Sequence, residues 1–204
     1  MTTITTEVAT IARWDDVQHA LTGGGDGASC QCIWPMLRDK DWARTTTPQR
    51  TEMFKEEVVA GPPPGLVAYV DGVAAGWVRI GPRPRQQRIT HTRTILSATA
   101  EPLDDDSVWA VTCFVVRREY RGTGLNAELL AAAVDYARGS GARVIEAYPV
   151  DTAGEKQSSN DLFHGTLGTF LSAGFRARGE LKPGRPLVVL DLAAGDSAGD
   201  SVAV

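Results

Sequence analysis

The sequence contains few cysteines, and its apolar residues form no long run. Three cysteines in 204 residues, Cys30, Cys32 and Cys113, cannot close a framework of disulfides, which excludes a small secreted disulfide-rich scaffold. The longest apolar stretch covers residues 129–134, whereas a membrane-spanning helix needs roughly 20 apolar residues. The first six residues (MTTITT) lack the basic and apolar regions of a secretory signal. We therefore expect a cytoplasmic protein with no membrane partner.

An excess of basic residues is also absent. Lys and Arg number 21 against 25 Asp and Glu, which gives a formal net charge of −4. This balance excludes a protein whose main task is to follow a nucleic-acid backbone, so we expect no nucleic-acid partner. Hydrophobic residues make up 43% of the chain, too many for a disordered protein and enough for one core. We expect one domain over residues 1–192 and a disordered tail over residues 193–204.

Turn signals and apolar periodicity divide the first half of the chain. They predict a strand over 7–12, helices over 14–21 and 48–60, and strands over 66–70 and 73–80. The pair Asp71-Gly72 between the last two strands favours a two-residue hairpin turn. Residues 81–107 are expected to form a long connection. The basic stretch from Arg79 to Arg93 either binds an anionic group or is a solvated loop.

The second half begins with the best strand pattern in the sequence. Residues 109–116 are apolar on both alternating faces, as expected of a central strand that is covered from both sides. The pattern then predicts a glycine-rich loop, a helix that ends at Gly139, a buried strand over 144–150, a helix over 162–173, and strands over 175–180 and 187–190.

The glycine-rich loop between the central strand and its helix is the segment of the sequence best suited to bind a ligand. Backbone N–H groups at the start of a helix are unpaired and lie at the positive end of the helix dipole, which makes them an anion site. Gly122 and Gly124 allow close approach because they have no Cβ, and Arg117 and Arg121 add positive charge. The segment therefore predicts a phosphate-binding loop.

Two phosphate-binding families compete for this loop. Residues 122–127 (GTGLNA) fit the dinucleotide fingerprint G-x-G-x-x-G/A, and Glu146 lies about 20 residues further on, where a ribose-binding carboxylate would be. However, the element begins after residue 108 and one further helix follows it, whereas a dinucleotide fold needs two βαβ halves. Rossmann-type dinucleotide binding is therefore the third hypothesis.

The better match is the acyl-CoA loop motif Q/R-x-x-G-x-G/A. Residues 121–126 (RGTGLN) supply its Arg and its first Gly, while Asn126 departs from the last position. Residues 170–175 (FLSAGF) are similar to the Y-x-x-x-G-F that ends a helix in the same family. Across about residues 66–190 the chain resembles the GNAT (Gcn5-related N-acetyltransferase) superfamily.

The resemblance implies an α+β fold. Its central, mostly antiparallel sheet has about six to seven strands and about four flanking helices, and it splays into a V between the strand ending at Val116 and the strand 144–150. Residues 66–192 would form the core and residues 1–65 the variable substrate-side segment. The resemblance also implies acetyl-CoA as cosubstrate, an amine acceptor and, by analogy alone, a homodimer.

The site residues implied by the resemblance follow the central strand and the loop. A backbone N–H near Val115 would hold the developing oxyanion. The expected cofactor-binding residues are Phe114, Val115, Val116, Arg117, Arg121, Gly122, Thr123, Gly124, Leu125 and Asn126.

The usual acid and base of the family are both missing. Phe170 occupies the position of the tyrosine acid, and Ala110 or Thr112 the position of the carboxylate base. The replacement candidates are Glu146, Tyr148, Asp151 and His164. Three of them also have an ordinary interpretation: Glu146 paired with an arginine such as Arg143, Tyr148 packed in the core, and His164 capping its helix or facing water.

The acceptor side and a metal site are the remaining questions. Trp34 and Trp42 are candidates to line an acceptor pocket, although both also fit simple core packing. Cys30 and Cys32 could begin a zinc site, but the remaining Cys and His residues are distant in sequence, so no metal is expected. The prediction is an N-acetyltransferase that moves an acetyl group from acetyl-CoA to a primary amine by direct attack; the alternative is an inactive acyl-CoA-binding sensor.

Overall fold

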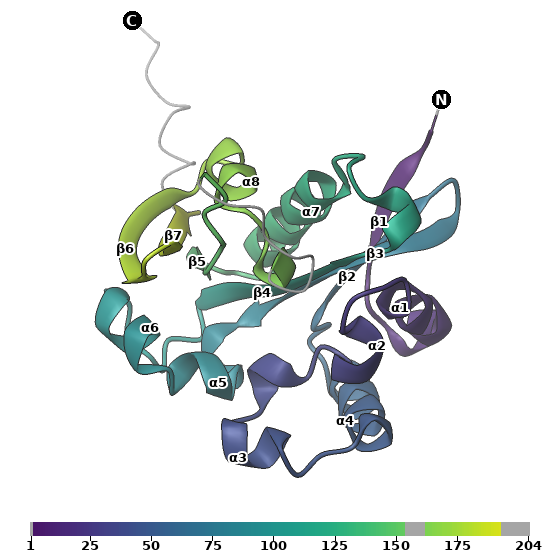
Figure 1. The fold of residues 1–204 in the computed structure, drawn as a ribbon, viewed down its shortest axis with the longest axis horizontal. Helices are drawn as coiled ribbons and strands as arrows, with labels where there is room; N and C mark the ends of the chain where they lie inside the picture. The colour runs from purple at the N-terminus through teal and green to yellow at the C-terminus, as the bar shows by residue number, and fades with distance from the viewer. Residues whose placement is uncertain (1, 154–161, 193–204) are drawn as a thin grey trace, which may run out of the picture.

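The computed structural model describes residues 2–153 and 162–192, and within them a seven-stranded sheet crosses the molecule (Figure 1). The tail predicted over residues 193–204 lies outside this range. The sheet order is β1-β2-β3-β4-β5-β7-β6. Its strands are β1 (Ile4–Val8), β2 (Gly65–Val70), β3 (Val73–Pro82), β4 (Val108–Val116), β5 (Val144–Ala147), β6 (Arg176–Lys182) and β7 (Arg185–Asp191).

Five of the six strand pairs in this order are antiparallel, and β4 with β5 is the parallel pair. This confirms the mostly antiparallel α+β sheet. A sheet with one parallel pair cannot supply the two βαβ halves of a dinucleotide fold, so the Rossmann hypothesis is wrong.

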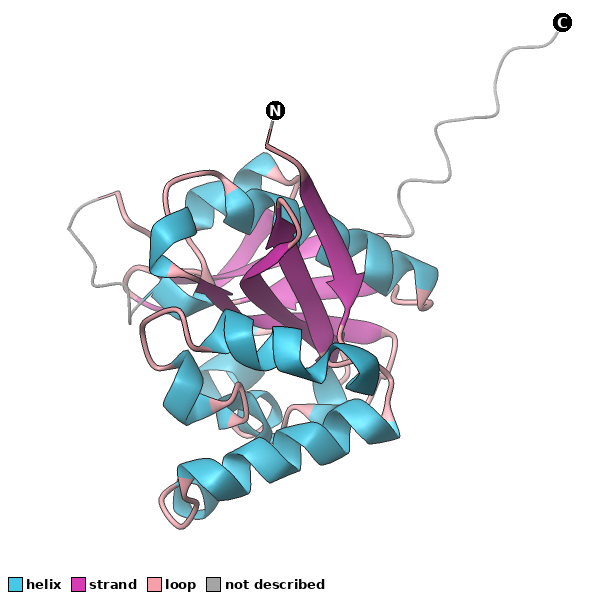
Figure 2. Ribbon diagram, turned by 90° about the vertical axis from the view of Figure 1, so that its right-hand side faces the viewer, coloured by secondary structure: helices cyan, strands magenta, loops and turns pink. Residues whose placement is uncertain are grey.

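Helices cover both faces of the sheet, as Figure 2 shows. On one face α7 (Leu125–Gly139) packs against β2, β3 and β4; on the other face α1 (Trp14–Leu21) packs against β3 and β4. The remaining helices are α2 (Gly27–Cys30), α3 (Asp39–Trp42), α4 (Thr47–Ala60), α5 (Gln87–Thr90), α6 (Arg93–Ala98) and α8 (Leu167–Ser172). This exceeds the four expected, because several are single turns. In the described part of the chain, no helix could span a membrane.

The hairpin between β2 and β3 is confirmed. Asp71 and Gly72 both have positive φ, 49° and 82°, as a type I′ turn requires. The first strand is not where the sequence predicted it. It covers Ile4–Val8 rather than residues 7–12, and residues 11–13 form a 3₁₀ turn, η1 (Ile11–Arg13), that leads into α1.

Residues 81–107 are not an open loop. They complete β3 and form η3 (Arg83–Arg85), α5 and α6 before β4 begins. Three arginines of the stretch 79–93 are buried and form ion pairs, Arg79 with Glu57, Arg83 with the buried Glu146, and Arg88 with Asp39, whose own side chain is exposed. The solvated-loop interpretation is therefore wrong, because these guanidinium groups tie the stretch to α4, β5 and α3.

The sheet opens between β4 and β5. These strands pair over residues 108–111 and 144–147 alone, and the register of β3 against β4 skips Thr112, which is a β-bulge. Residues 112–116 continue along β3 without a partner on the β5 side among the described strands. The strand predicted over 144–150 ends at Ala147, and Val150 makes an isolated bridge to Thr166. The V-shaped splay is thus present.

Candidate functional site

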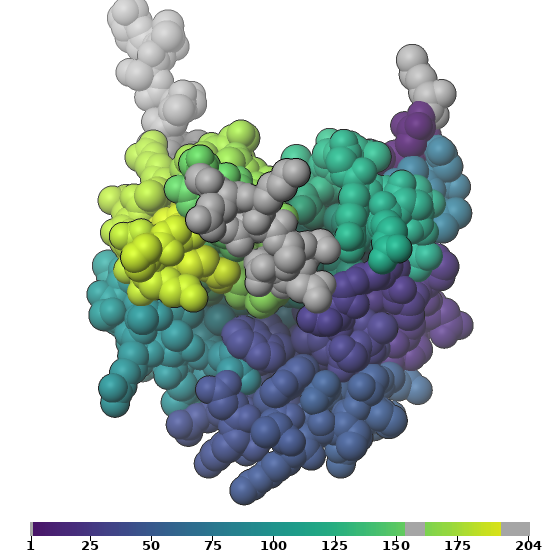
Figure 3. All heavy atoms as spheres, viewed as in Figure 1, coloured from purple at the N-terminus to yellow at the C-terminus, as the bar shows by residue number. Residues whose placement is uncertain are grey.

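A cavity of about 810 Å³ opens beside the free part of β4. Figure 3 shows the N-terminal segment next to the residues that follow β4, and a hydrogen bond from Arg118 N–H to Gly23 O (2.9 Å) joins them. The lining residues come from three places, the segment 24–42, the segment 113–126, and 162–163: Gly24, Gly25, Asp26, Gly27, Ser29, Cys30, Cys32, Trp34, Trp42, Cys113, Phe114, Val115, Val116, Tyr120, Arg121, Gly122, Gly124, Leu125, Asn126, Leu162 and Phe163.

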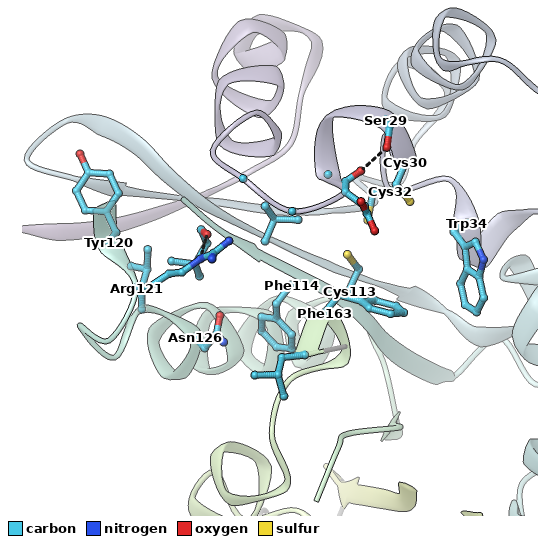
Figure 4. A pocket seen from close by; sticks show the side chains of 18 of the residues that line it. Ser29, Cys30, Cys32, Trp34, Cys113, Phe114, Tyr120, Arg121, Asn126 and Phe163 are labelled. Carbon is cyan, nitrogen blue, oxygen red and sulfur yellow. Dashed lines mark hydrogen bonds between the residues drawn. The ribbon is translucent and has the colours of Figure 1, made fainter. Parts of the chain in front are cut away.

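The glycine-rich loop forms one end of the cavity (Figure 4). Gly122 and Gly124 have φ values of 78° and 85°, which a residue with a Cβ rarely adopts. The first hydrogen-bonded N–H of α7 is that of Ala127, which donates to Gly124 O (2.8 Å). Within the described residues the N–H groups of 122–126 have no acceptor, and they lie at the positive end of a 15-residue helix. This arrangement can bind an anion.

Two polar side chains complete that end. The Arg121 guanidinium lines the cavity, and its Nε donates to Val116 O (3.2 Å). The Oδ1 atom of Asn126 is buried without a protein hydrogen-bond partner, so it can accept a hydrogen bond from a ligand N–H or O–H. An anionic, hydrogen-bonding ligand such as a phosphate ester fits this donor set.

Two of the expected loop residues face elsewhere. Arg117 Nη1 donates to His19 O (2.7 Å) at the end of α1, and its Nε donates to Glu119 (2.8 Å). Thr123 Oγ1 donates to Tyr120 O (2.7 Å). Neither residue lines the cavity, so their side chains serve the local structure instead.

The β4 backbone presents hydrogen-bonding groups to the gap. Arg117 N–H donates to Ala75 O (3.0 Å), and the same register pairs Val115 with Trp77. Because successive N–H groups of a strand point to opposite sides, Val115 N–H turns toward β3, and the N–H groups of Phe114 and Val116 turn toward the gap. The oxyanion donor expected near Val115 is therefore better assigned to Phe114 or Val116.

Glu146 and Tyr148 lie in a buried network outside the cavity. Glu146 is 0% exposed and accepts hydrogen bonds from Arg83 (2.9 Å), Thr99 (2.5 Å) and the Tyr148 hydroxyl (3.1 Å). Burial, with the neighbouring Glu146 charge, raises the pKa of Tyr148 well above its usual value. The arginine that pairs with Glu146 is Arg83, whereas Arg143 pairs with Glu101 and Asp105. Neither catalytic candidate is positioned to meet a ligand in the cavity.

Asp151 and His164 also do not line the cavity. Asp151 accepts a hydrogen bond from Ala153 N–H (2.9 Å). His164 ends η5 (Leu162–His164) and packs against Phe163, with the ring centroids 4.0 Å apart. Burial, followed by the charge of Arg185, lowers the pKa of His164 to about 3, so the ring is neutral at pH 7. Phe170 is buried against Phe114 and Phe175.

The other end of the cavity is aromatic. Trp34 and Trp42 both line it, and each indole is stacked by an arginine, Arg88 at 4.0 Å and Arg50 at 3.6 Å from the ring centroids. These contacts fix the two rings in place. Asp26 is the single carboxylate among the described lining residues.

All three cysteines line the same cavity, which sequence reasoning missed. The available signal was the pair Cys30-x-Cys32 together with a cysteine in the central strand. The thiols are free, and among the described residues no group of three or more His, Cys, Asp or Glu could hold a metal ion. Trp77 Nε1 donates to Cys32 Sγ at 3.1 Å.

A splayed α+β sheet with an anion-binding loop at the helix after its central strand defines the class of this protein. The acetyltransferase (GNAT) family matches residues 33–164, which is more than half of the chain. The chain therefore belongs to the GNAT acetyltransferase family, as its resemblance indicated. None of the curated proteins matches its sequence significantly.

Solved structures share the fold. A GNAT-family acetyltransferase from Streptococcus pneumoniae has a TM-score of 0.53 at 15% identity over 93% of this chain and 100% of its own. PaiA N-acetyltransferase from Thermoplasma acidophilum, in complex with coenzyme A, has a TM-score of 0.52 at 11% identity over 93% and 99%. A GNAT acetyltransferase from Brucella melitensis, in complex with acetyl-CoA, has a TM-score of 0.51 at 14% identity over 93% and 88%.

Proposed function

We propose that this protein transfers an acetyl group from acetyl-CoA to a primary amine of a small molecule or a lysine side chain. The observation that carries the proposal is the single cavity that joins the unpaired N–H groups of residues 122–126 to the free side of β4. Membership of the acetyltransferase family supports it, as do the complexes of the Thermoplasma and Brucella proteins with coenzyme A and acetyl-CoA.

The residues present fit this cosubstrate. The N–H groups of residues 122–126 and Arg121 would hold the pyrophosphate, and the unpartnered Asn126 Oδ1 would accept a hydrogen bond from another part of the cosubstrate. The N–H group of Val116 would bind the amide-containing arm that follows the pyrophosphate, in the manner of an added strand.

When bound, acetyl-CoA supplies an acyl group activated as a thioester. The chain contributes position and charge stabilisation. Phe114 N–H can donate to a carbonyl oxygen on which negative charge develops. A cavity that holds two reactants in a fixed orientation can supply about 7–11 kcal/mol of the barrier.

The far end of the cavity suits an amine with an apolar body. Trp34 and Trp42 provide flat apolar surfaces, and Asp26 provides the negative charge that attracts an ammonium group. The acceptor must lose a proton before it attacks, and none of Glu146, Tyr148, Asp151 and His164 lines the cavity. This last observation also favours the second candidate function, an acyl-CoA-binding domain without transfer activity.

Melting the protein with acetyl-CoA, CoA and NAD tests the binding step. A ligand at about 100 times its Kd adds roughly 2.7 kcal/mol, and each kcal/mol shifts a domain of this size by roughly 2–4 °C. Both CoA species should shift the Tm and NAD should not; the absence of a shift with either CoA species would refute both candidate functions. Chromatographic measurement of CoA release with a panel of amines then separates them, since the binding domain alone releases none. A cytoplasmic location and a homodimer remain predictions.

A further inference from the structure

The β-bulge at Thr112 determines which backbone N–H groups of β4 face the gap. The register of β3 against β4 skips Thr112, so β4 contains one extra residue at this point. An extra residue moves each later residue of the strand by one position against its neighbour. Without the bulge, the N–H groups of Phe114 and Val116 would turn toward β3, and the gap would lose the donors that the proposed function uses.

The side chains of β4 change faces at the same position. Before the bulge, Trp109 and Val111 belong to the hydrophobic cluster that contains α7. After it, Phe114 belongs to this cluster, while Cys113 belongs to the cluster on the other face that contains α1. Odd-numbered residues therefore point toward α7 before the bulge and away from it afterwards.

The buried side chain of Gln86 spans the bulge. Its Nε2 donates to Ala110 O (3.0 Å) in β4 and to Gly81 O (3.3 Å) in β3, and its Oε1 accepts from the Thr112 hydroxyl (2.7 Å). Because backbone carbonyls only accept, these contacts fix which end of the amide is the donor. Gln86 is 2% exposed and Thr112 is 0% exposed, so water does not compete for these hydrogen bonds.

The backbone of Gln86 is itself held in place. Gln86 is the N-cap of α5, its N–H donates to Arg83 O (2.9 Å), and its carbonyl oxygen accepts from Ile89 N–H (2.9 Å). Arg83 in turn pairs with Glu146 of β5. The Gln86 amide is therefore a fixed brace between β3 and β4, next to the point where β4 and β5 separate.

We propose that Gln86 is a positioning residue for the acetyl transfer, an inference that rests on the proposed function. Its amide holds the bulge at Thr112, and the bulge aims the Phe114 N–H at the carbonyl oxygen of the bound acetyl group. Neither Gln86 nor Thr112 lines the cavity, so both act through the β4 backbone and touch neither substrate. Without the brace, the strand relaxes toward the regular register, which turns the Phe114 N–H away from the gap.

Two substitutions remove the brace to different extents. Gln86→Met keeps the length of the side chain and removes all three hydrogen bonds, whereas Thr112→Val keeps the shape of the side chain and removes one. Thr112→Ser retains the hydroxyl and should behave as wild type. Tyr136→Phe is the matched control, because it removes a hydrogen bond to Pro63 O (3.0 Å) in the last turn of α7, away from the bulge.

The direct readout is the carbonyl stretch of bound acetyl-CoA, labelled with ¹³C at the acetyl carbonyl and measured by isotope-edited infrared difference spectroscopy. Because a hydrogen bond to the carbonyl lowers this frequency, the band should lie higher in Gln86→Met and Thr112→Val than in wild type, Thr112→Ser and Tyr136→Phe. Turnover at saturating substrates should fall in the same two variants by up to about 10²–10³-fold, the cost of losing an oxyanion donor. The Tm shift with CoA should remain, because CoA has no acetyl carbonyl.

These measurements separate this proposal from the proposed function. An unchanged carbonyl band in a folded Gln86→Met that binds acetyl-CoA would overturn the positioning role and leave the function standing. If Gln86→Met does not fold, Thr112→Val carries the same test. A wild-type protein that binds acetyl-CoA but releases no CoA with any amine would refute the transfer, and the band would still decide whether Gln86 positions the donor. The absence of acetyl-CoA binding in the wild type would overturn both.

Discussion

Arg83 Nη1 lies 2.9 Å from Glu146 Oε2, and both side chains are out of contact with water, at 1% and 0% exposure. Arg83 comes from η3 after β3, and Glu146 lies in the middle of β5. Thr99 and Tyr148 also donate to the same carboxylate. The pair therefore ties the segment 83–102 to the half of the sheet beyond the gap. Removing one partner leaves a buried charge without compensation, which costs far more than the loss of an exposed pair.

We predict that Glu146→Ala destabilises the protein by about 3–5 kcal/mol. Urea unfolding measures the change. Glu101→Ala is the control, because it removes a partner from Arg143, whose side chain is 42% exposed, and exposed pairs contribute about 0–1 kcal/mol. The milder Glu146→Gln should keep its turnover per folded molecule. A large loss of turnover in a fully folded Glu146→Gln would instead make Glu146 catalytic.

The central strand, its loop and the following helix could be predicted because their signals are local. Residues 109–116 are apolar on both alternating faces except at Thr112, and α7 repeats its apolar residues at helical spacing from Leu125 until Gly139. The hairpin turn at Asp71 and Gly72 depends on two residues alone. In each case the information lies within a few neighbouring positions.

The composition of the site could not be predicted, because it depends on contacts between distant segments. Arg83 resembles a loop arginine in sequence, and its partner is 63 residues away. Cys32 and Cys113 belong to one buried cluster with Trp77 and with residues of α1 and α4, a grouping that no periodicity records. The same holds for Arg117, which resembles a phosphate ligand until α1 supplies His19 O as its acceptor.

Gly122→Ala should weaken the binding of acetyl-CoA. The residue has φ of 78°, and a Cβ added there would meet open space, so the expected effect is backbone strain of roughly 1–2 kcal/mol rather than a clash. If the loop relaxes to a different φ, its N–H groups turn away from the phosphate. Gly72→Ala is a matched control, with φ of 82° and equally open space in the distant hairpin. Calorimetry should find weaker binding for Gly122→Ala alone; equal affinities would argue against the loop as the binding site.

Arg121 and Arg117 allow a second matched comparison. A hydrogen bond to a charged group contributes roughly 1.5–3 kcal/mol, so Arg121→Gln should raise the Kd for CoA by about 10–150-fold. The loss should shrink at high salt, which screens exposed charges. Arg117→Gln should instead lower the Tm, because its guanidinium bonds to His19 O and Thr22 Oγ1, and should leave the Kd nearly unchanged. The opposite pattern would assign the phosphate contact to Arg117.

We predict that the neutral, buried His164 makes the folded protein less stable at mildly acidic pH. Its pKa is lowered to about 3 in the folded protein, from 6.5 in an unfolded chain. The unfolded chain therefore takes up a proton near pH 6.5 while the folded protein does not, so the stability that the neutral ring contributes is lost as the pH falls below 6.5. The slope approaches about 1.4 kcal/mol per pH unit at most. Urea midpoints at pH 7, 6 and 5 should fall less for His164→Gln than for wild type, whereas exposed His91→Gln should follow wild type.

We predict that the KM for a cationic acceptor depends on the charge of Asp26, which lines the cavity. Asp26 is the single carboxylate among the described lining residues, and it is exposed, so its attraction for an ammonium group is screened by water. Asp26→Asn should raise the KM for a diamine by about two- to fivefold, which corresponds to about 0.4–1 kcal/mol of an exposed ion pair, and leave the Kd for CoA within error. Asp15→Asn removes the same charge from α1 without touching the cavity and should leave both values unchanged. Because the two variants carry the same net charge, an equal rise in KM for both would show that the amine senses the charge of the whole protein rather than the carboxylate at the cavity, and the cationic-acceptor prediction would fail.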